Sequence, residues 1–315
     1  MAIPSAGSAL SLSAIQTEFG GSNPISMSEY YAGGSNVPSG TTGDAGNIPS
    51  SGAIAVSQFY GSSNRIAIAL TISSTTQSYN IYSNRGGTYS AGNSDVTLTV
   101  QAIVGSTGAS GLDTGSQWTS GDTIKIINNS QIVGKGNAGG AGGARSGAGS
   151  AGTAGQAAIN LGYPVTIQNN GGFIRGGGGG GGGGAGGSFT QPGGGQKGQT
   201  PTTVQFGGGG GGGGAGQQGG AGGAAGQTNS STGATAAAGA AGSISGAGAG
   251  GDGSAQGSGS DGGGSGGHFG NAGAAGQSSN QASGGGGGAA GKGINLNGNQ
   301  VTWEDGQSNV QGAVS

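Results

Sequence analysis

Apolar and polar residues alternate in several short stretches between residues 63 and 130, and this period of two predicts β-strands. The alternation is clearest at 66–72 and 95–103, and a third apolar stretch spans 123–127. Clusters of Gly, Asn and Ser separate the stretches, and these residue types are typical of turns. Several short strands divided by turn signals predict a small β-sandwich over 63–130.

A strand followed by an Asn- or Gly-containing turn recurs later in the chain. The pattern at 124–133 returns at 165–174 and, more weakly, at 294–303. Because Asn and Gly readily supply the positive φ angles of tight turns, each copy predicts a β-hairpin. The hairpins bracket two glycine blocks, and the last one predicts a C-terminal hairpin over 294–315.

Residues 1–62 repeat a different phrase, in which an apolar–small–apolar–Ser stretch precedes aromatic or other large residues. Copies of it stand at 10–16, 25–31 and 54–60. Each copy predicts a short strand that enters a helix of one or two turns. About 60 residues with so few large apolar side chains make a poor core on their own. This module is therefore expected to fold against something else.

The first copy also carries signals for the two ends of its helix. Ser13 and Gln16 have the spacing of a capping box, in which a serine and a glutamine satisfy free N–H groups at the helix start. Gly20 has the residue type that commonly ends a helix. We therefore expect a helix that starts at Ser13 and stops at Gly20.

Glycine accounts for 88 of the 315 residues, and most of it lies in residues 131–293. The longest runs are Gly176–Gly184 and Gly207–Gly214. A collagen triple helix is excluded because it needs glycine at every third position throughout. A flexible coil is one alternative. The other is a bundle of polyproline-II-like helices with three residues per turn, which can pack closely without Cβ atoms and bond through their backbone groups.

The composition favours the ordered alternative. Charged residues make up 6% of the chain and it contains only 7 prolines, whereas disordered chains are usually rich in both. We therefore expect a mainly β protein in four parts. These are a repeat module at 1–62, a β-sandwich at 63–130, a polyglycine II helix bundle at 131–293 and a β-hairpin at 294–315.

Charge and hydropathy exclude several classes of function. The net charge is −2 and the basic residues are scattered, so no nucleic-acid partner is expected. No segment approaches the ~20 apolar residues that span a bilayer, so no membrane insertion is expected, and no signal peptide pattern follows Met1. The chain has no cysteine, which excludes disulfides and thiolate metal sites.

The candidate catalytic motifs lack the neighbouring residues that their chemistry would need. The GxGxxG match at 134–139 lacks the strand–helix context of a dinucleotide site. His268 is the only histidine, and an exposed turn residue is the simpler interpretation of it. Asp113 and Asp122 flank Trp118 and leave a bound calcium ion as an alternative. We expect no enzyme, no cofactor and no metal site.

Several stretches resemble bacteriophage proteins. The stretches are 10–21, 25–31, 55–61, 124–140, 163–187 and 301–307. The first three resemble the N-terminal module of phage virion structural proteins. The next two look like the glycine-rich region of phage tail fibre and host-specificity proteins, and the last is similar to the close of such proteins.

This resemblance implies a protein of the virion tail whose glycine region forms a polyglycine sandwich, as in adhesins that cap long tail fibres. Those adhesins bind host receptors through loops between glycine helices. The implied partners are a host surface receptor, either protein or glycan, and other phage tail proteins. Analogy with fibres implies a homo-oligomer, which we expect to be a trimer.

Two sets of residues are candidates for these contacts. The candidate receptor-binding residues are Phe189, Gln191, Lys197, Phe206, His268 and Phe269. The candidate virion-docking residues are Phe19, Tyr30, Tyr31, Phe59 and Tyr60. Two alternatives stay open: a structural virion component such as a baseplate, collar or capsid decoration without receptor binding, and a silk-like filament protein.

Overall fold

The computed structural model describes residues 3–193, 200–227, 236–253 and 261–315, and it is mainly β with few helices. The contacts within the chain divide it into two compact units. The first unit comprises Met1–Leu70, Arg85–Thr97 and Trp118–Ile124, and the second Thr71–Asn84, Leu98–Gln117 and Lys125–Ser315.

The N-terminal module contains three short helices that start at equivalent points of the repeated phrase. They are α1 (Leu12–Phe19), η1 (Met27–Tyr30) and η2 (Val56–Phe59). The cap of α1 is Ser11, whose Oγ accepts the Ala14 N–H at 3.2 Å, so the expected start at Ser13 is wrong by two residues. Ser13 instead contacts Ser11 Oγ through its own hydroxyl. Gly20 ends the helix as expected, with φ 78°.

Each copy of the phrase contributes one large residue to the core of this module. Ile15, Tyr30 and Phe59 occupy the same position of the three copies and are fully buried. The rings of Tyr30 and Phe59 meet edge to face with centroids 6.2 Å apart, and Phe19 adds a second such contact at 5.8 Å from Phe59. A two-stranded sheet of β1 (Thr42–Gly43) and β2 (Gly46–Asn47) completes the module.

The following strands form three sheets. Their orders are β17-β12-β9-β6-β3, β18-β13-β10-β7-β4 and β16-β11-β8-β5. The strands are β3 (Ile66–Ile72), β4 (Thr76–Gln77), β5 (Tyr79–Asn80), β6 (Ser94–Val100), β7 (Val104–Gly105), β8 (Ser110–Asp113), β9 (Thr123–Asn128), β10 (Gln131–Val133), β11 (Ala157–Asn160), β12 (Val165–Gln168), β13 (Phe173–Arg175), β16 (Ile294–Asn295), β17 (Val301–Asp305) and β18 (Val310–Gln311). Two short helices, α2 (Ile81–Asn84) and η3 (Gln307–Asn309), lie between them.

The chain visits the three sheets in turn, so that each coil contributes one strand to each sheet. The first coil is β3-β4-β5, the second is β6-β7-β8, and the third and fourth start with β9-β10 and β12-β13. Neighbouring strands are parallel throughout the sheets β18-β13-β10-β7-β4 and β16-β11-β8-β5, and so are β9, β12 and β17 in the remaining sheet. This arrangement is a three-sided parallel coil, related to β-helices.

Parallel pairing corrects two expectations. The stretch over 63–130 is not a sandwich of antiparallel sheets, and the copies at 124–133, 165–174 and 294–303 are not hairpins. In each copy the turn leads from one sheet into the next, and the copies pair with each other, as Ile126 does with Ile167 and Ile167 with Trp303. A turn signal marks the place where a strand ends, but it does not reveal where the next strand goes.

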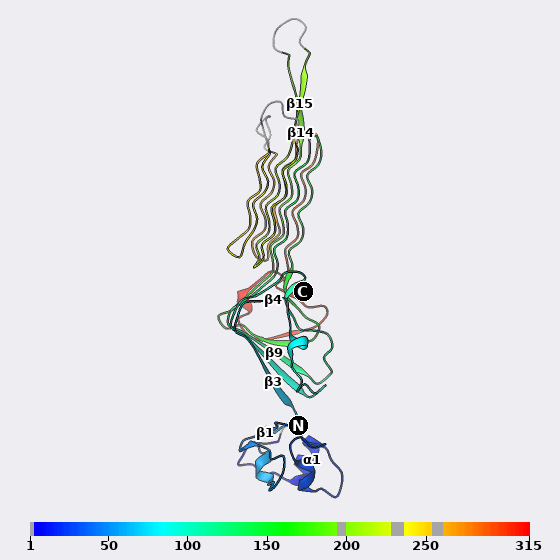
Figure 1. Ribbon diagram of the computed structural model, residues 1–315, viewed down its shortest axis with the longest axis vertical. Helices are drawn as coiled ribbons and strands as arrows, with labels where there is room; N and C mark the ends of the chain where they lie inside the picture. The colour runs from blue at the N-terminus through cyan, green and yellow to red at the C-terminus, as the bar shows by residue number, and fades with distance from the viewer. Residues whose placement is uncertain (1–2, 194–199, 228–235, 254–260) are drawn as a thin grey trace. The chain divides into compact units, whose positions relative to one another are not determined.

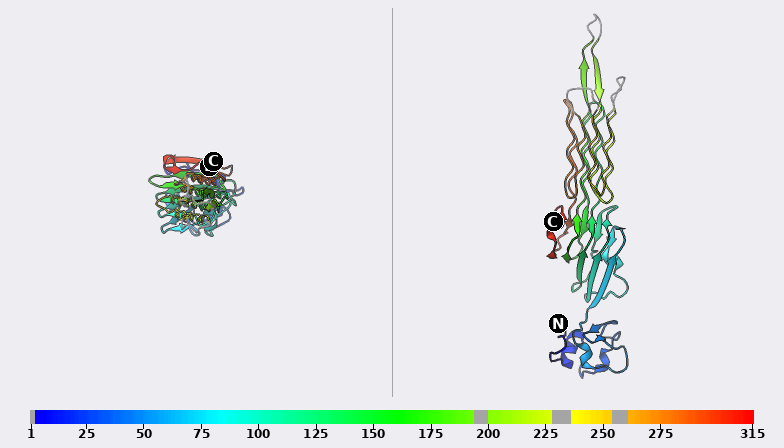
Figure 2. Two further views of the ribbon diagram at one scale, coloured as in Figure 1. Left: turned by 90° about the horizontal axis from the view of Figure 1, so that it is seen from above. Right: turned by 90° about the vertical axis from the view of Figure 1, so that its left-hand side faces the viewer.

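Both glycine-rich stretches are inserted at the same corner of this coil. Residues 134–156 connect β10 to β11, and the much longer stretch 176–293 connects β13 to β16, so both replace the same corner in consecutive coils. Within them the chain runs back and forth in extended segments that lie side by side (Figures 1 and 2). The bonds between segments are backbone hydrogen bonds that mostly measure 2.7–3.2 Å.

Residues 176–186 are enclosed by other segments. The N–H groups of 177–186 donate in strict rotation to 147–156, to 209–215 and to 271–277, and Gly176 N–H donates to the Gln311 carbonyl. The carbonyl groups of 176–184 accept in the same rotation from three further stretches, 137–143, 264–270 and 285–291. The partner therefore repeats every third residue, and no hydrogen bond joins two residues of the segment itself.

The second glycine run has the same kind of environment. Residues 208–216 donate to 137–143, 261–267 and 237–243 with a period of three. All residues of 176–186 and 207–216 are buried. A Cβ built on Gly180 would lie 1.9 Å from the Ala138 carbonyl oxygen, and one on Gly211 would lie 2.1 Å from the Gly181 oxygen. These two runs lack side chains because they have neighbours on every side.

A two-stranded antiparallel hairpin links the two enclosed runs. It comprises β14 (Gly187–Gln191) and β15 (Thr202–Phe206), with Phe189 opposite Val204. β14 follows residues 176–186 directly, and β15 leads directly into 207–216. The hairpin therefore rises from the two most enclosed segments of the bundle (Figure 1).

Candidate functional site

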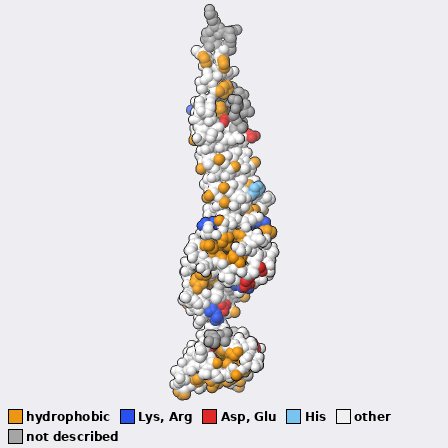
Figure 3. All heavy atoms as spheres, turned by 180° about the vertical axis from the view of Figure 1, so that it is seen from behind, with side chains coloured by type: hydrophobic (Ala, Val, Ile, Leu, Met, Phe, Trp, Pro, Cys, Tyr) orange, Lys and Arg blue, Asp and Glu red, His pale blue; other side chains and the backbone are white. Residues whose placement is uncertain are grey.

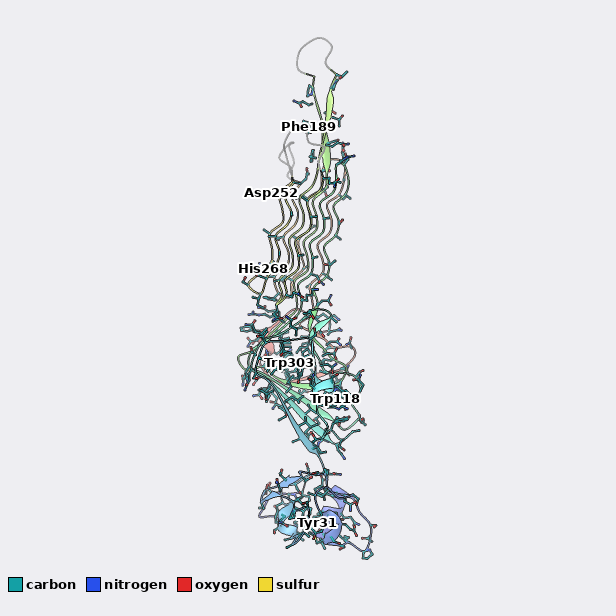
Figure 4. The ribbon with its side chains drawn as sticks, viewed as in Figure 1. Tyr31, Trp118, Phe189, Asp252, His268 and Trp303 are labelled. Atoms are coloured by element: carbon teal, nitrogen blue, oxygen red, sulfur yellow. The ribbon has the colours of Figure 1, made fainter. Side chains whose placement is uncertain are left out.

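The predicted receptor-binding residues fall at two opposite ends of the glycine segments (Figure 4). Phe189 and Gln191 lie on β14, at the end that we call the hairpin end. His268 and Phe269 lie at the other end, where Gly270 N–H donates to the Gly176 carbonyl, and we call this the sheet end because β13 and β18 adjoin it. Lys197 lies outside the described residues.

Only part of the hairpin-end set is available for contact. Gln191 is exposed and Phe189 is half-buried, whereas Phe206 is 7% exposed. The Phe206 ring covers Gly187 so closely that a Cβ there would meet the ring at 2.3 Å. Phe206 therefore supports the base of the hairpin and is a poor candidate for direct receptor contact.

Two turns that the sequence did not single out also lie at the hairpin end. The first is the turn at Ala144–Gly147, in which Gly147 N–H donates to the Ala144 carbonyl at 2.8 Å and Arg145 has φ 51°. In the second, Ser279 Oγ donates to the Gly186 carbonyl at 2.7 Å. Asn280 Nδ2 also reaches the Ser188 carbonyl at 3.5 Å, so this turn packs against the start of β14.

The sheet end combines aromatic rings with one cation. The Arg175 guanidinium carbon lies 4.2 Å from the Phe173 ring centroid and 5.3 Å from that of Phe269. Its Nη1 donates to Gln131 Oε1 at 3.2 Å. Burial lowers the pKa of Arg175, although an arginine remains protonated at any physiological pH. His268 is exposed beside this group, and Figure 3 shows the only histidine at the surface.

Buried asparagines connect successive coils at one corner. Asn128 and Asn169 are both fully buried, and Asn128 Nδ2 donates to Asn169 Oδ1 at 2.8 Å. Asn169 Nδ2 continues the series to the Gly306 carbonyl at 2.9 Å. At 165–174 the expected positive φ belongs to Gly171 and not to these asparagines, whereas at 294–303 Asn297 and Gly298 have it, with φ 49° and 82°. The role of Asn128 and Asn169 at the turn is therefore to bond one coil to the next through their side chains.

A second series of this kind lies at the end of the third sheet, and it involves Asp113. This carboxylate accepts from Asn160 Nδ2 at 2.8 Å, from the Gly115 N–H at 2.6 Å and from Asn80 Nδ2 at 3.4 Å. The Asp122 carboxylate likewise accepts from Tyr89, Ser94 and Thr119. Both carboxylates are thus used by protein donors, which argues against the calcium alternative. The described residues contain no cluster of three or more potential metal ligands.

The predicted virion-docking aromatics stabilise the N-terminal module through contacts within it. Phe19, Tyr30 and Phe59 are buried. Tyr31 and Tyr60 are half-buried, and their hydroxyls donate to the Gly52 carbonyl and the Ser8 carbonyl, respectively. Six large apolar side chains that remain partly exposed belong to the first half of each phrase: Leu10, Leu12, Ile25, Met27, Ile54 and Val56.

Comparison with known proteins supports a phage origin. Residues 67–206 match the family model described as phage tail fibre adhesin Gp38. Among solved structures, the chain is similar to the gp37-gp38 adhesin tip complex of the bacteriophage S16 long tail fiber. The identity is 24%, the TM-score 0.46, and the match covers 84% of this chain and 88% of that one. No curated protein matches the chain.

The family match supports a phage tail adhesin and points to a structural protein without enzymatic activity. A location in the virion tail follows from it. No helix among the described residues has the length and apolarity that crossing a membrane requires.

Proposed function

We propose that this protein attaches to the phage tail through residues 1–62 and binds a receptor on the host-cell surface with its hairpin end. The observation that carries the proposal is the origin of the β14–β15 hairpin in the two enclosed glycine runs. Binding residues commonly sit on loops that a rigid scaffold positions. A hairpin that continues two segments bonded on every side has such a scaffold.

We further propose that the glycine segments are polyglycine II helices. A helix of this type has three residues per turn and no hydrogen bonds of its own. The hydrogen-bond partners along 176–186 repeat every third residue, and each bond leaves the segment. These two features support the proposal. The bundle would then hold several turns at fixed positions without a hydrophobic core.

Replacing residues 188–205 of the hairpin by a short Gly-Ser turn tests receptor binding. The expected result is a large loss of phage adsorption while particles assemble normally, because the contact surface is removed and the bundle stays intact. A milder variant is Phe189→Ala. Its control is Val314→Ala, because Val314 is an exposed apolar side chain (37% exposed) near the C-terminus and not on the hairpin. Adsorption is measured as the rate at which free phage disappear from a suspension of host cells.

Normal adsorption by the hairpin replacement would contradict receptor binding by this end. In that outcome, a structural role in the virion without receptor contact becomes the better interpretation. Immunogold labelling of intact particles separates the two, because an adhesin lies at the distal end of the tail apparatus and a decoration protein lies on the capsid or collar.

For the attachment, three equivalent apolar pairs on the N-terminal module suggest the form of the partner. Leu10 and Leu12, Ile25 and Met27, and Ile54 and Val56 occupy the same positions in the three phrases, and all six are half-buried. A surface that repeats three times fits a partner that presents three equal sites. The proposed partner is therefore the end of a homotrimeric tail protein.

Polar substitutions in one pair test this attachment. Ile25→Ser with Met27→Ser should release the protein from tails, because desolvated apolar contacts are replaced by hydroxyls. Ser22→Ala, at an exposed polar position next to the same phrase, is the control. Co-purification with tails measures the loss, and unchanged co-purification would contradict this docking surface.

The same proposal sets the stoichiometry. Three phrases in one chain would match three partner chains, so one copy would sit on each trimer. The homotrimer expected by analogy with fibres would instead give three copies. Native mass spectrometry of the isolated tail tip distinguishes the two numbers.

A further inference from the structure

A pocket opens beside Arg175 at the sheet end of the glycine segments. Its volume is about 510 Å³, which is within the range of small-molecule sites. Strand β13, the turns at 243–246 and 268–271, and the end of β18 with its following glycine contribute its walls. All of these belong to one compact unit of the chain.

Arg175 is the charged group of this pocket, and it has no acidic partner there. None of the residues that line the pocket is an Asp or a Glu. A guanidinium has five N–H donors, and among the described residues only the bond from Nη1 to Gln131 Oε1 uses one of them. Its Nε is enclosed without any acceptor.

The orientation of the guanidinium is fixed by its neighbours. It lies over the rings of Phe173 and Phe269, at centroid distances of 4.2 and 5.3 Å. Cations are attracted to the faces of aromatic rings. The charge is therefore held in place by contacts that leave most of its hydrogen-bonding capacity unused.

The rest of the lining suits a molecule with hydroxyl groups. Ser245, His268, Asn271 and Gln311 are exposed polar side chains around the opening. Ile244 adds an apolar surface that is 39% exposed. Polar groups for hydroxyls and an apolar surface for C–H groups are the two contacts that a sugar ring needs.

We propose that this pocket binds an anionic saccharide, whose carboxylate or phosphate group pairs with the Arg175 guanidinium. The planar fork of arginine matches both groups with two parallel hydrogen bonds. The polar rim would bind the ring hydroxyls. The site lies at the opposite end of the segments from the β14–β15 hairpin, and its occupation does not depend on the receptor-binding role proposed for that hairpin.

Binding of simple sugars to the purified full-length protein tests the proposal. The probes are glucuronate for a carboxylate, glucose 1-phosphate for a phosphate, and glucose as the neutral control. Saturation-transfer NMR and calorimetric titration measure binding. We expect one or both anionic probes to bind at least about tenfold more tightly than glucose, because hydrogen bonds to charged groups are the stronger ones.

Three variants assign the binding to this pocket. Arg175→Gln should weaken the anionic probe about tenfold or more, and Arg175→Lys should restore part of the affinity because it keeps the charge without the fork. Ser245→Trp, in an exposed turn at the rim, should block the pocket without removing the charge. Lys135→Gln is the control because it removes a positive charge outside the pocket. Thermal unfolding verifies that each variant is folded.

The outcomes are distinct. Preference for glucuronate or for glucose 1-phosphate identifies the anionic group. Binding of neither probe, equal binding of glucose, or binding that both Arg175→Gln and Ser245→Trp leave unchanged would each overturn the proposal. Phage adsorption is a separate measurement, so loss of the hairpin's function and loss of this site can be told apart.

Discussion

Each glycine segment has glycine at the positions that face another segment. In 176–186 every position faces a neighbour, and every residue is Gly or the small Ala185. Residues 147–156 lie at the edge, and their glycines at 149, 152 and 155 are the positions whose Cβ would meet the backbone of 177–183 within 2.0 Å. The intervening Ala, Ser and Thr face outward. Glycine content thus follows the number of neighbours at each residue.

Gly180→Ala and Gly286→Ala should therefore have opposite consequences. A Cβ on Gly180 would lie 1.9 Å from the Ala138 oxygen, whereas a Cβ on the exposed Gly286 would meet nothing within 4 Å. We expect Gly180→Ala to lower the free energy of unfolding by at least about 3 kcal/mol. Gly286→Ala should leave it unchanged or raise it by up to about 1 kcal/mol, since alanine restricts the unfolded chain. Scanning calorimetry measures both, and equal unfolding temperatures would refute this packing.

The corner asparagines allow a second comparison within one turn. Asn128→Ala would leave the buried Asn169 Oδ1 without its donor, and an unsatisfied buried polar atom costs about 1–3 kcal/mol. Asn129 is exposed, so Asn129→Ala should change stability by less than about 0.5 kcal/mol. Urea unfolding followed by tryptophan fluorescence measures the difference. If both substitutions cost the same, the side-chain series between coils does not stabilise the fold.

At the scale of elements, one carboxylate connects three strands of the first unit. Arg65, immediately before β3, donates through Nε and Nη2 to Asp95 on β6, both at 2.7 Å. Thr123, the first residue of β9, donates to the same carboxylate. The hydrogen bond from Arg65 lowers the pKa of Asp95, with burial acting against it and Thr123 adding to it.

This pKa shift gives stability a definite pH dependence. Because the folded state holds the Asp95 pKa below its ordinary value of about 3.9, the contribution is fully present above that value. It is lost as the pH falls through the folded pKa. The Asp95 side chain is 43% exposed, so the contribution is about 1 kcal/mol or less.

Arg65→Gln should raise the Asp95 pKa toward its ordinary value and flatten the loss of stability below about pH 4. Carboxyl ¹³C NMR follows the titration directly. Lys125→Gln is the control, since Lys125 pairs with Glu304 at 2.7 Å and not with Asp95. An Asp95 midpoint that Arg65→Gln leaves in place would show that the ion pair does not set this pKa.

Over the whole molecule, order in the glycine region depends on bonds between distant residues. Gly181 N–H, for example, donates to Gly212 and its carbonyl accepts from Gly140. We expect the amides of 176–186 and 207–216 to exchange with solvent hydrogen as slowly as those of β9 and β12, because each is buried and bonded. Hydrogen exchange measured by mass spectrometry tests this. Complete exchange within seconds would indicate the flexible coil that composition alone leaves open.

The elements were easier to predict than their arrangement. The alternating stretches at 66–72 and 95–103 contain β3 and β6, and the three phrases in 1–62 contain the three helices of the module. The sandwich and the hairpins were wrong because a parallel coil and an antiparallel hairpin use the same strand patterns and turn residues. The arrangement of the candidate site residues was equally hard to predict. Phe189 and His268 lie at opposite ends of the glycine segments, and Phe189 belongs to strand β14 and not to a turn.

The amino-acid sequence establishes where this chain can pack without side chains, because only glycine allows backbones to approach so closely from every direction. It also establishes the strands and the small helical module, through local patterns of apolar residues and caps. The pairing of particular glycine segments is visible only in the folded chain, since every glycine offers the same N–H and C=O groups to any partner. The identity of the residues gathered at each end follows from that arrangement.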